Sequence, residues 1–160
     1  MKHLLFLLSI LPMSLYASGP FGISWGQSLT DFGLVINASN YQYVITDYVP
    51  DPYTQSTQYI LIGNSDEGIT GVKLKTKSFK AFSSDLTLAY DEAIAYLEAA
   101  GYGQVAVTES KLSSYHCIIQ AICVGKTWTG INADGTKVLL EKTGVSHSHI
   151  FISMFFSVSS

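Results

Sequence analysis

The amino-acid sequence predicts a single α+β domain in which an antiparallel sheet of five to seven strands packs on one main helix, with a short N-terminal helix. Three observations support this prediction. One stretch has apolar residues at helical spacing, several shorter stretches are rich in β-branched and aromatic residues, and no repeat or low-complexity linker divides the chain. The domain is expected to cover residues 18–160, an ordinary length for one hydrophobic core.

Residues 1–17 are expected to be a cleavable secretory signal peptide. A short basic region around Lys2 precedes the apolar run Leu4–Leu11, which Pro12 ends. A transmembrane helix needs about 20 apolar residues, so this run is too short, and an uncleaved anchor is the alternative. Cleavage is expected after Ala17 or one residue later. The mature protein is therefore predicted to be periplasmic or secreted, with no transmembrane span.

The main helix is expected over residues 85–100. Ser83, Ser84 and Asp85 offer a cap for its first turn, and Gly101 follows its last turn, where glycine commonly ends a helix. The apolar residues at helical spacing are Leu86, Tyr90, Ala93, Ile94 and Leu97. They share one face, which is expected to pack on the sheet.

A second, brief helix is expected after Ser28. The Ser28 hydroxyl can cap it, and Asp31 lies three residues on, as in a capping box. Gly33 would end it. Residues 21–26, just before this helix, are expected to form a short strand.

The other expected strands are residues 41–48, 58–63, 72–78, 104–108, 115–124, 127–131, 137–142 and 148–158. Residues 64–68 and 132–135 have the composition of tight turns. The run Ile150–Phe156 is apolar on both faces, which is typical of a strand in the interior of a sheet. It is therefore predicted to lie near the centre.

One expected strand alternates strictly in polarity. Val72, Leu74, Thr76 and Ser78 fall on one face, and Lys73, Lys75 and Lys77 fall on the other. This pattern predicts an antiparallel hairpin with one buried and one wet face. The lysine face is interpreted as a solvated face or a protected edge, and an anion-binding stripe is the alternative.

The charge composition argues against nucleic acid as a partner. All nine basic residues are lysine, against 12 acidic residues, and loss of Lys2 with the signal would leave a net charge of about −4. Arginine is the residue that best grips phosphates and reads base edges, and this chain has none. The chain also lacks the polybasic cluster that holds proteins on anionic membranes.

The chain has two cysteines, Cys117 and Cys123, and a disulfide between them is expected in an exported protein. If the residues between them formed a straight strand, the two Cα atoms would lie about 20 Å apart, whereas a disulfide tolerates about 4.4–6.8 Å. The bond therefore requires a turn or bulge. A pair of free buried thiols is the alternative.

A zinc site is the sharpest chemical candidate, because His147 and His149 would share one strand face and could join Cys117 and Cys123. The cysteines have five residues between them rather than the usual two to four, and an oxidising compartment competes for the thiols. We therefore expect no metal and no cofactor.

Ser146, His147 and Asp134 offer the residue types of a hydrolase triad. No motif that positions a nucleophile and a base accompanies them. A non-enzymatic protein is therefore favoured, and a metal-dependent or Ser/His hydrolase centred on His147 and His149 is the alternative.

Tyrosines are concentrated in one region of the chain, and we interpret Tyr41, Tyr43, Tyr53 and Tyr59 as a candidate contact surface. Tyrosine suits contacts with proteins or glycans, because its ring is apolar and its hydroxyl is polar. Core packing is the alternative interpretation of these residues.

The segment Phe21–Ser28 reads FGISWGQS and precedes a break at Pro50–Pro52, a turn at Gly68–Ile69 and the sequence Gly101–Gly103. This order resembles small exported proteins of Gram-negative bacteria that begin with an FG-x-x-WG-x-S stretch. The resemblance implies an address in the bacterial envelope and names no catalytic residue. We expect a binding protein whose partner is an envelope protein or a cell-wall component, for instance an inhibitor or immunity-type protein.

Overall fold

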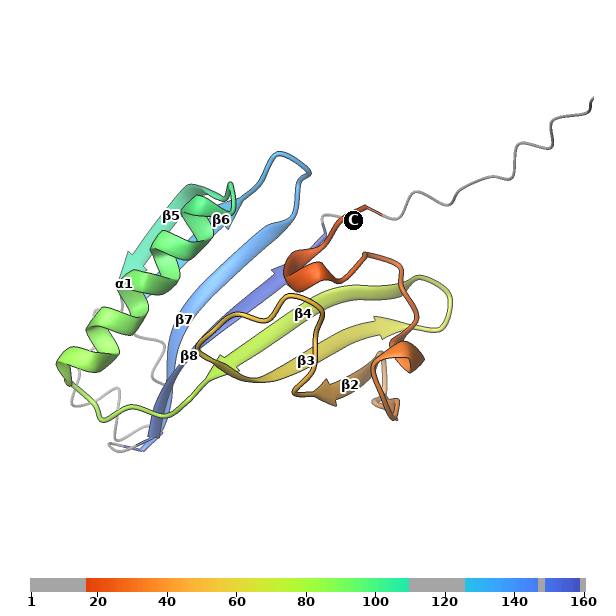
Figure 1. Cartoon of the computed structure of the whole chain (residues 1–160), viewed down its shortest axis with the longest axis horizontal. Coiled ribbons are helices and arrows are strands. Elements are labelled where there is room, and N and C mark those ends of the chain that lie inside the picture. The colour runs from red at the N-terminus through yellow and green to blue at the C-terminus, as the bar shows by residue number, and fades with distance from the viewer. Residues whose placement is uncertain (1–16, 110–125, 147–148, 159–160) are drawn as a thin grey trace, which may run out of the picture.

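A computed structural model of the chain describes residues 17–109, 126–146 and 149–158. In these residues one antiparallel sheet of eight strands packs on a single α-helix (Figure 1). The elements are β1 (Ile36–Asn37), β2 (Gln42–Thr46), β3 (Ser56–Asn64), β4 (Gly68–Thr76), α1 (Ser84–Ala99), β5 (Gly103–Glu109), β6 (Lys126–Ile131), β7 (Lys137–Ser146) and β8 (His149–Ser157).

The sheet is built from two antiparallel meanders that meet in its middle. Its strand order is β1-β2-β3-β4-β8-β7-β6-β5, so the first meander runs from an edge to the centre. The helix α1 then carries the chain to the opposite edge, and β5 to β8 return to the centre, where β8 pairs with β4. The predicted central position of the apolar strand near the C-terminus is confirmed.

The predicted architecture is wrong in the number of strands and in the short N-terminal helix. The sheet gains β1, a strand of two residues that pairs Ile36 with Tyr43 and has no apolar pattern for sequence analysis to detect. The expected helix after Ser28 is a three-residue 3-10 turn, Leu29–Asp31. Ser28 does cap this turn, but Asp31 accepts a hydrogen bond from Gln27 rather than reaching back to Ser28. A single turn cannot offset the cost of helix nucleation.

The strand expected at residues 21–26 is also absent. Instead, Pro20–Gly22 forms a 3-10 turn in which Phe21 has a left-handed backbone, with φ 60° and ψ 29°. The backbone groups here are satisfied outside the sheet, since Gly19 N–H donates to Ile23 O and Asp51 N–H donates to Phe21 O. The turn inserts the Phe21 ring into the core, where it is 3% exposed.

The main helix agrees with its prediction to within one residue at each end. The Leu86 N–H donates to the Ser83 hydroxyl at 3.2 Å, which caps the first turn. At the other end Gly101 has φ 86°, and Tyr102 N–H donates to Leu97 O. This positive φ turns the chain sharply into β5.

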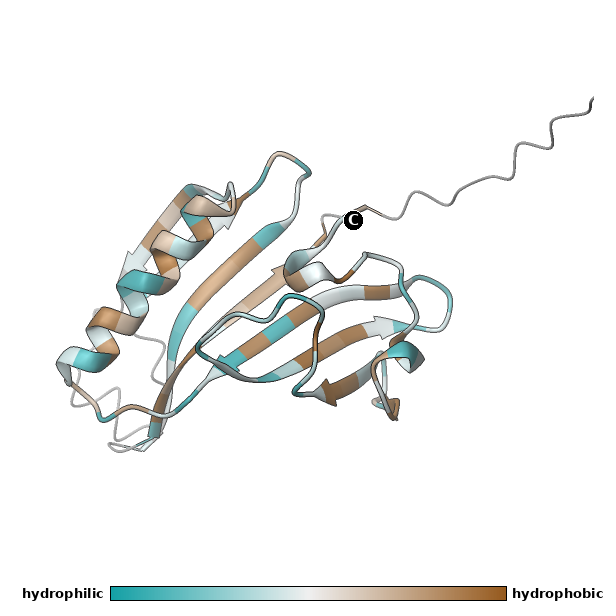
Figure 2. Cartoon of the chain, viewed as in Figure 1, coloured by the Kyte–Doolittle hydropathy of each residue, from teal (hydrophilic) through white to brown (hydrophobic). Residues whose placement is uncertain are grey.

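One face of the sheet forms the core, and we call it the inner face. The predicted alternation of the fourth strand is confirmed there, because Val72, Leu74 and Thr76 are all buried, although Ser78 is exposed. The helix α1 contacts β7 and β8, and the Leu29–Asp31 turn contacts β2 and β3. Apolar residues alternate along the strands, whereas the β3–β4 turn is hydrophilic (Figure 2).

Within the described residues, no helix has the length and hydrophobicity needed to cross a membrane.

Candidate functional site

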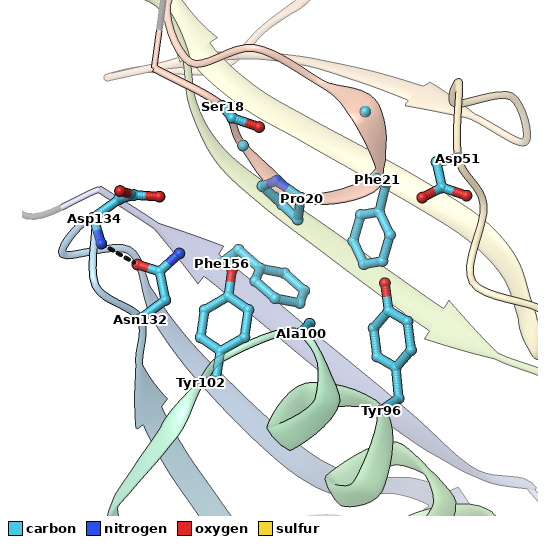
Figure 3. A pocket seen from close by; sticks show the side chains of 12 residues that line it. Ser18, Pro20, Phe21, Asp51, Tyr96, Ala100, Tyr102, Asn132, Asp134 and Phe156 are labelled. Atoms are coloured by element: carbon cyan, nitrogen blue, oxygen red, sulfur yellow. Dashed lines mark hydrogen bonds between the residues drawn. The ribbon is translucent and has the colours of Figure 1, made fainter.

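A pocket of about 420 Å³ lies where four parts of the chain meet (Figure 3). These parts are the turn Pro20–Gly22, the C-terminal end of α1, the turn between β6 and β7, and the end of β8. They are far apart in sequence and are brought together by the two meanders. The volume falls within the range of about 300–1,000 Å³ that is typical of small-molecule sites.

Aromatic rings form the floor of this pocket. They belong to Phe21, Tyr96, Tyr102 and Phe156. The Phe21 ring packs edge-on against Phe156 with centroids 5.1 Å apart, and it stacks on Tyr96 at 6.4 Å. Tyr102 contacts the other side of Phe156 at 5.6 Å. Because these rings pack on one another, the floor is preformed.

Polar groups form the rim. Asp51 and Asp134 lie at opposite ends of the pocket, and Asn132 stands beside Asp134 (Figure 3). Both carboxylates belong to exposed residues. The pocket therefore has an aromatic floor that carries two phenol hydroxyls and an acidic, solvated rim.

The Tyr102 hydroxyl belongs to a nearly buried residue and opens to the pocket, with no hydrogen-bond partner among the described residues. Tyr102 is 7% exposed, and its hydroxyl points into the pocket (Figure 3). It forms no hydrogen bond with any residue in the described ranges. Burial, with smaller contributions from Tyr96 and Asp134, raises the pKa of Tyr102 to about 12. The phenol is therefore neutral at pH 7 and can either donate or accept a hydrogen bond.

Tyr96 provides a second hydroxyl at the pocket. It lies on the last turn of α1 and is half-buried. Burial, followed by the nearby Asp51 and Tyr59, raises the pKa of Tyr96. Its hydroxyl therefore also stays protonated at neutral pH.

Local backbone geometry fixes the N-terminal wall of the pocket. Phe21 is one of two non-glycine residues with positive φ among the described residues, and Gly22 follows with φ 71°. A Cβ on Gly22 would lie 2.8 Å from the Pro50 side chain, so only glycine allows this close approach. The contact holds Asp51 beside the Phe21 turn.

The opposite wall is the turn between β6 and β7, which was predicted from its sequence. The Asn132 side-chain oxygen accepts hydrogen bonds from the N–H groups of Asp134 and Thr136, at 3.1 and 2.9 Å. Thr136 in turn accepts a hydrogen bond from the Trp25 indole at 3.3 Å. This bond ties the β6–β7 turn to the N-terminal segment and holds the two walls together.

A second hollow, of about 380 Å³, lies on the opposite face of the sheet, which we call the outer face. Its lining is largely apolar and includes Val105, Leu139 and Phe155. No polar group converges on it except Lys137 and hydroxyls of the strands. It therefore offers little to orient a ligand.

The four tyrosines of the expected contact surface do not lie together. Tyr53 and Tyr59 are 7% and 1% exposed and belong to the core, which corrects their assignment to a surface. The Tyr59 hydroxyl accepts hydrogen bonds from the Tyr53 N–H and from the Ser56 hydroxyl. Tyr41 is 48% exposed, and its ring lies 5.9 Å from that of Tyr43. Only this pair still lies at the surface.

Ser146 and Asp134, two residues of the alternative hydrolase interpretation, are not brought together either. His149 Nδ1 lies 2.9 Å from the Ser146 hydroxyl, at the exposed end of the β7–β8 hairpin. Asp134 lies at the other end of the ten-residue β7, roughly 30 Å away at the rise of a strand. The contact between Ser146 and His149 therefore has no acid from Asp134 to orient it.

The cysteines Cys117 and Cys123 and the histidine His147 lie outside the described residues. In the ranges that the structure describes, no group of three or more His, Cys, Asp or Glu residues could hold a metal ion. The expected disulfide stays a prediction.

Sequence reasoning missed the pocket because its residues have no common motif. Tyr102 and Asp51 stand in the Gly-Tyr-Gly and Pro-Asp-Pro stretches, where they were interpreted only as features of a turn and a break. Polar residues flanked by Gly or Pro are a weak signal of a loop that carries function.

No family model matches this chain, and no curated protein or solved structure matches it significantly. The assignment of a function therefore depends on the geometry of the pocket.

Proposed function

We propose that this chain is a binding protein of the bacterial envelope, periplasmic or secreted, that holds its ligand in the aromatic pocket between the N-terminal segment and the β6–β7 turn. In this proposal the ligand is a small molecule or a side chain of an envelope protein or cell-wall component. Binding without chemical conversion is the activity that the pocket supports best.

One observation carries the proposal. The Tyr102 side chain is 7% exposed, and its hydroxyl faces the pocket without a hydrogen-bond partner among the described residues. Because every fully buried side-chain nitrogen or oxygen among these residues has a partner, the Tyr102 hydroxyl is open to the pocket rather than sealed in the core. A ligand that fills the pocket would replace solvent at this hydroxyl and form a hydrogen bond with it.

The chemistry of the lining favours binding over catalysis. Among its residues are two carboxylates, two phenols and an amide, but no histidine, cysteine or lysine. Ser18 is the single aliphatic hydroxyl that lines it, and among the described residues no hydrogen bond joins this hydroxyl to a carboxylate that could act as its base. The hydrolase alternative requires His147 and His149, and His149 is not part of this pocket.

A screen of a fragment library by protein-observed NMR tests this function. The library contains cationic, neutral and anionic fragments in equal numbers. We expect some fragments to shift the amide signals of Phe21, Tyr102 and Asn132. Absence of any such fragment would contradict the proposal.

Two substitutions on the helix end make the test specific. Ala100→Trp fills the pocket, because Ala100 lines it, and should abolish the shifts. Ala99→Trp is the matched control, because Ala99 is also exposed and lies next to Ala100 but does not line the pocket. Equal loss of binding in both variants would show that the fragments bind elsewhere.

A further inference from the structure

We propose that the ligand of this pocket carries an organic ammonium group, whose charge lies between the two rim carboxylates and whose carbon body lies on the aromatic floor. This inference depends on the proposed function and adds the chemical class of the ligand. The shared chemistry is the ammonium group, whether it belongs to a free small amine or to a lysine side chain.

The rim carries negative charge that has no partner among the residues that the structure describes. Neither Asp51 nor Asp134 has an ion pair or a side-chain hydrogen bond with any residue that the structure describes. No lysine or histidine lines the pocket. An anionic ligand would meet two like charges and no compensating donor cluster, whereas a cation would be attracted to both ends.

The floor adds a preference for cations over neutral ligands. A cation placed within about 6 Å of an aromatic ring is attracted to its face, and the attraction strengthens when the site is shielded from water. Among the lining rings, Tyr96 is only half-buried, so part of its ring is open to a cation in the pocket. The protein already uses the same contact elsewhere, with Lys142 Nζ lying 4.5 Å from the centroid of Tyr90.

The Tyr102 hydroxyl is the independent observation that points to a ligand. It is 7% exposed as a residue, faces the pocket and lacks a partner among the described residues. A neutral phenol oxygen accepts a hydrogen bond from an N–H donor. A primary ammonium could therefore donate to Tyr102 while its charge interacts with Asp134.

Processing of the N-terminus bears on the charge of the rim. Ser18 lines the pocket, so cleavage after Ala17 would place the terminal ammonium of Ser18 there. Its positive charge would offset the negative charge of one of the two carboxylates, and the rim would keep a net negative charge. The titrations below therefore use the exported chain, with its N-terminus determined by intact mass.

The test compares choline with 3,3-dimethylbutan-1-ol, which has the same shape but no charge. Binding is followed by NMR shifts of pocket amides at low salt. We expect choline to bind about tenfold more tightly, the size of a cation–π contact combined with rim charges. Equal affinity of the two probes would overturn the inference.

The source of the ammonium is resolved by a second pair of probes. N-acetyl-lysine methylamide is compared with the norleucine analogue, which lacks the amine. Preference for the lysine probe over choline indicates a side chain of a partner protein, and the reverse indicates a free small amine. Either preference supports a ligand with an ammonium group. If neither cationic probe binds more tightly than its neutral analogue, the inference is contradicted.

Substitutions locate the charge effect. The double variant Asp51→Asn/Asp134→Asn should weaken choline binding about three- to tenfold and leave the neutral isostere unchanged. Asp66→Asn in the β3–β4 turn removes an exposed carboxylate that does not line the pocket, and should leave both affinities unchanged. Tyr102→Phe should weaken the binding of the lysine probe more than the binding of choline, because choline has no N–H group to donate to the Tyr102 hydroxyl.

These arms separate the two proposals. Suppose that neutral or anionic fragments bind the native pocket but not the Ala100→Trp variant, and that cations do not bind. The pocket is then a ligand site, and the ammonium inference is wrong. If no probe or fragment binds the pocket, the proposed function itself is wrong.

Discussion

The two faces of the sheet contain similar apolar residues but have different surroundings. On the inner face, Leu74, Leu140 and Ile152 are completely buried beneath α1 and the N-terminal segment. On the outer face, Leu139 and Phe155 are only partly buried, and Ile45 is 48% exposed. Within the described residues, no helix or loop layer packs on this outer face.

The outer face covers its apolar groups with its own side chains. Phe155 lies close over Gly71, where a Cβ would be 3.2 Å from its ring. Lys75 extends over the Phe151 ring, with Nζ 4.0 Å from the centroid. Long lysine stems and flat rings can thus shield a sheet face locally. The comparison shows that burial on the outer face comes from neighbours in the sheet, whereas on the inner face it comes from a second layer.

The largest expected effect is alkaline unfolding, which probes the tyrosines of the inner side. Burial is the main reason that the pKa values of Tyr53, Tyr90 and Tyr102 are each raised to about 12, against about 10 in an unfolded chain. Between these values the folded state holds more protons than the unfolded state, so stability is full below pH 10 and falls as the pH rises toward 12.

Absorbance at 295 nm, which reports tyrosinate, measures this difference. Tyr53, Tyr90 and Tyr102 should ionise only as the fold is lost. Urea unfolding at pH 9, 10 and 11 should show the falling stability. Ionisation of Tyr53, Tyr90 and Tyr102 near pH 10, with circular dichroism unchanged, would contradict the prediction.

The next effect compares two neighbouring leucines on β7 that point to opposite faces. Leu140→Ala on the inner face should cost about 2–5 kcal/mol, because it leaves a cavity in a fully buried site. Leu139→Ala on the outer face should cost about 1 kcal/mol or less, since the side chain keeps part of its contact with water. Chemical denaturation of both variants gives the two values, and equal losses would show that a second layer covers the outer face.

A smaller effect concerns the cap of the helix that covers the inner face. Ser83→Ala removes the acceptor for the Leu86 N–H and should cost about 1 kcal/mol, or about 2–4 °C in melting temperature for a domain of this size. Ser84→Ala is the control, because Ser84 is exposed and lies inside the first turn. Thermal unfolding should give a lower melting temperature for Ser83→Ala than for Ser84→Ala. Identical melting curves would show that Ser83 does not stabilise the helix as its cap.

The smallest expected effect is on the outer face of β2. Ile45→Thr should change stability by no more than about 0.5 kcal/mol, because the side chain is half exposed and threonine suits a strand. Val44→Thr, on the adjacent and fully buried position, should cost about 1–3 kcal/mol through its buried hydroxyl. If Ile45→Thr were costly, and more so at high protein concentration, the outer face would be an interface between copies of the chain.

Local patterns predicted much of the secondary structure. The helix and its caps, the alternating fourth strand and the Asn132 turn all depend on residues within a few positions of one another. The length and apolarity of the strand near the C-terminus even indicated its place in the sheet. Such features are encoded by periodicity and turn chemistry, which act locally.

The errors arose where distant contacts outweigh local preference. The FGISWG stretch has the composition of a strand, yet Phe21 adopts a strained turn because its ring packs between Tyr59, Tyr96 and Phe156. The tyrosine group was divided for the same reason, since alternation cannot show which side of a strand receives a covering layer.

By itself, then, the sequence determined the helix, most of the strands and their turns, and a net negative charge in a chain without arginine. Only the tertiary structure decided the eight-strand order and the pocket between Asp51 and Asp134. The physical reason is that helices and turns are set by interactions between near neighbours. The pocket exists only because two meanders close on one another and bring together side chains that have no local relation.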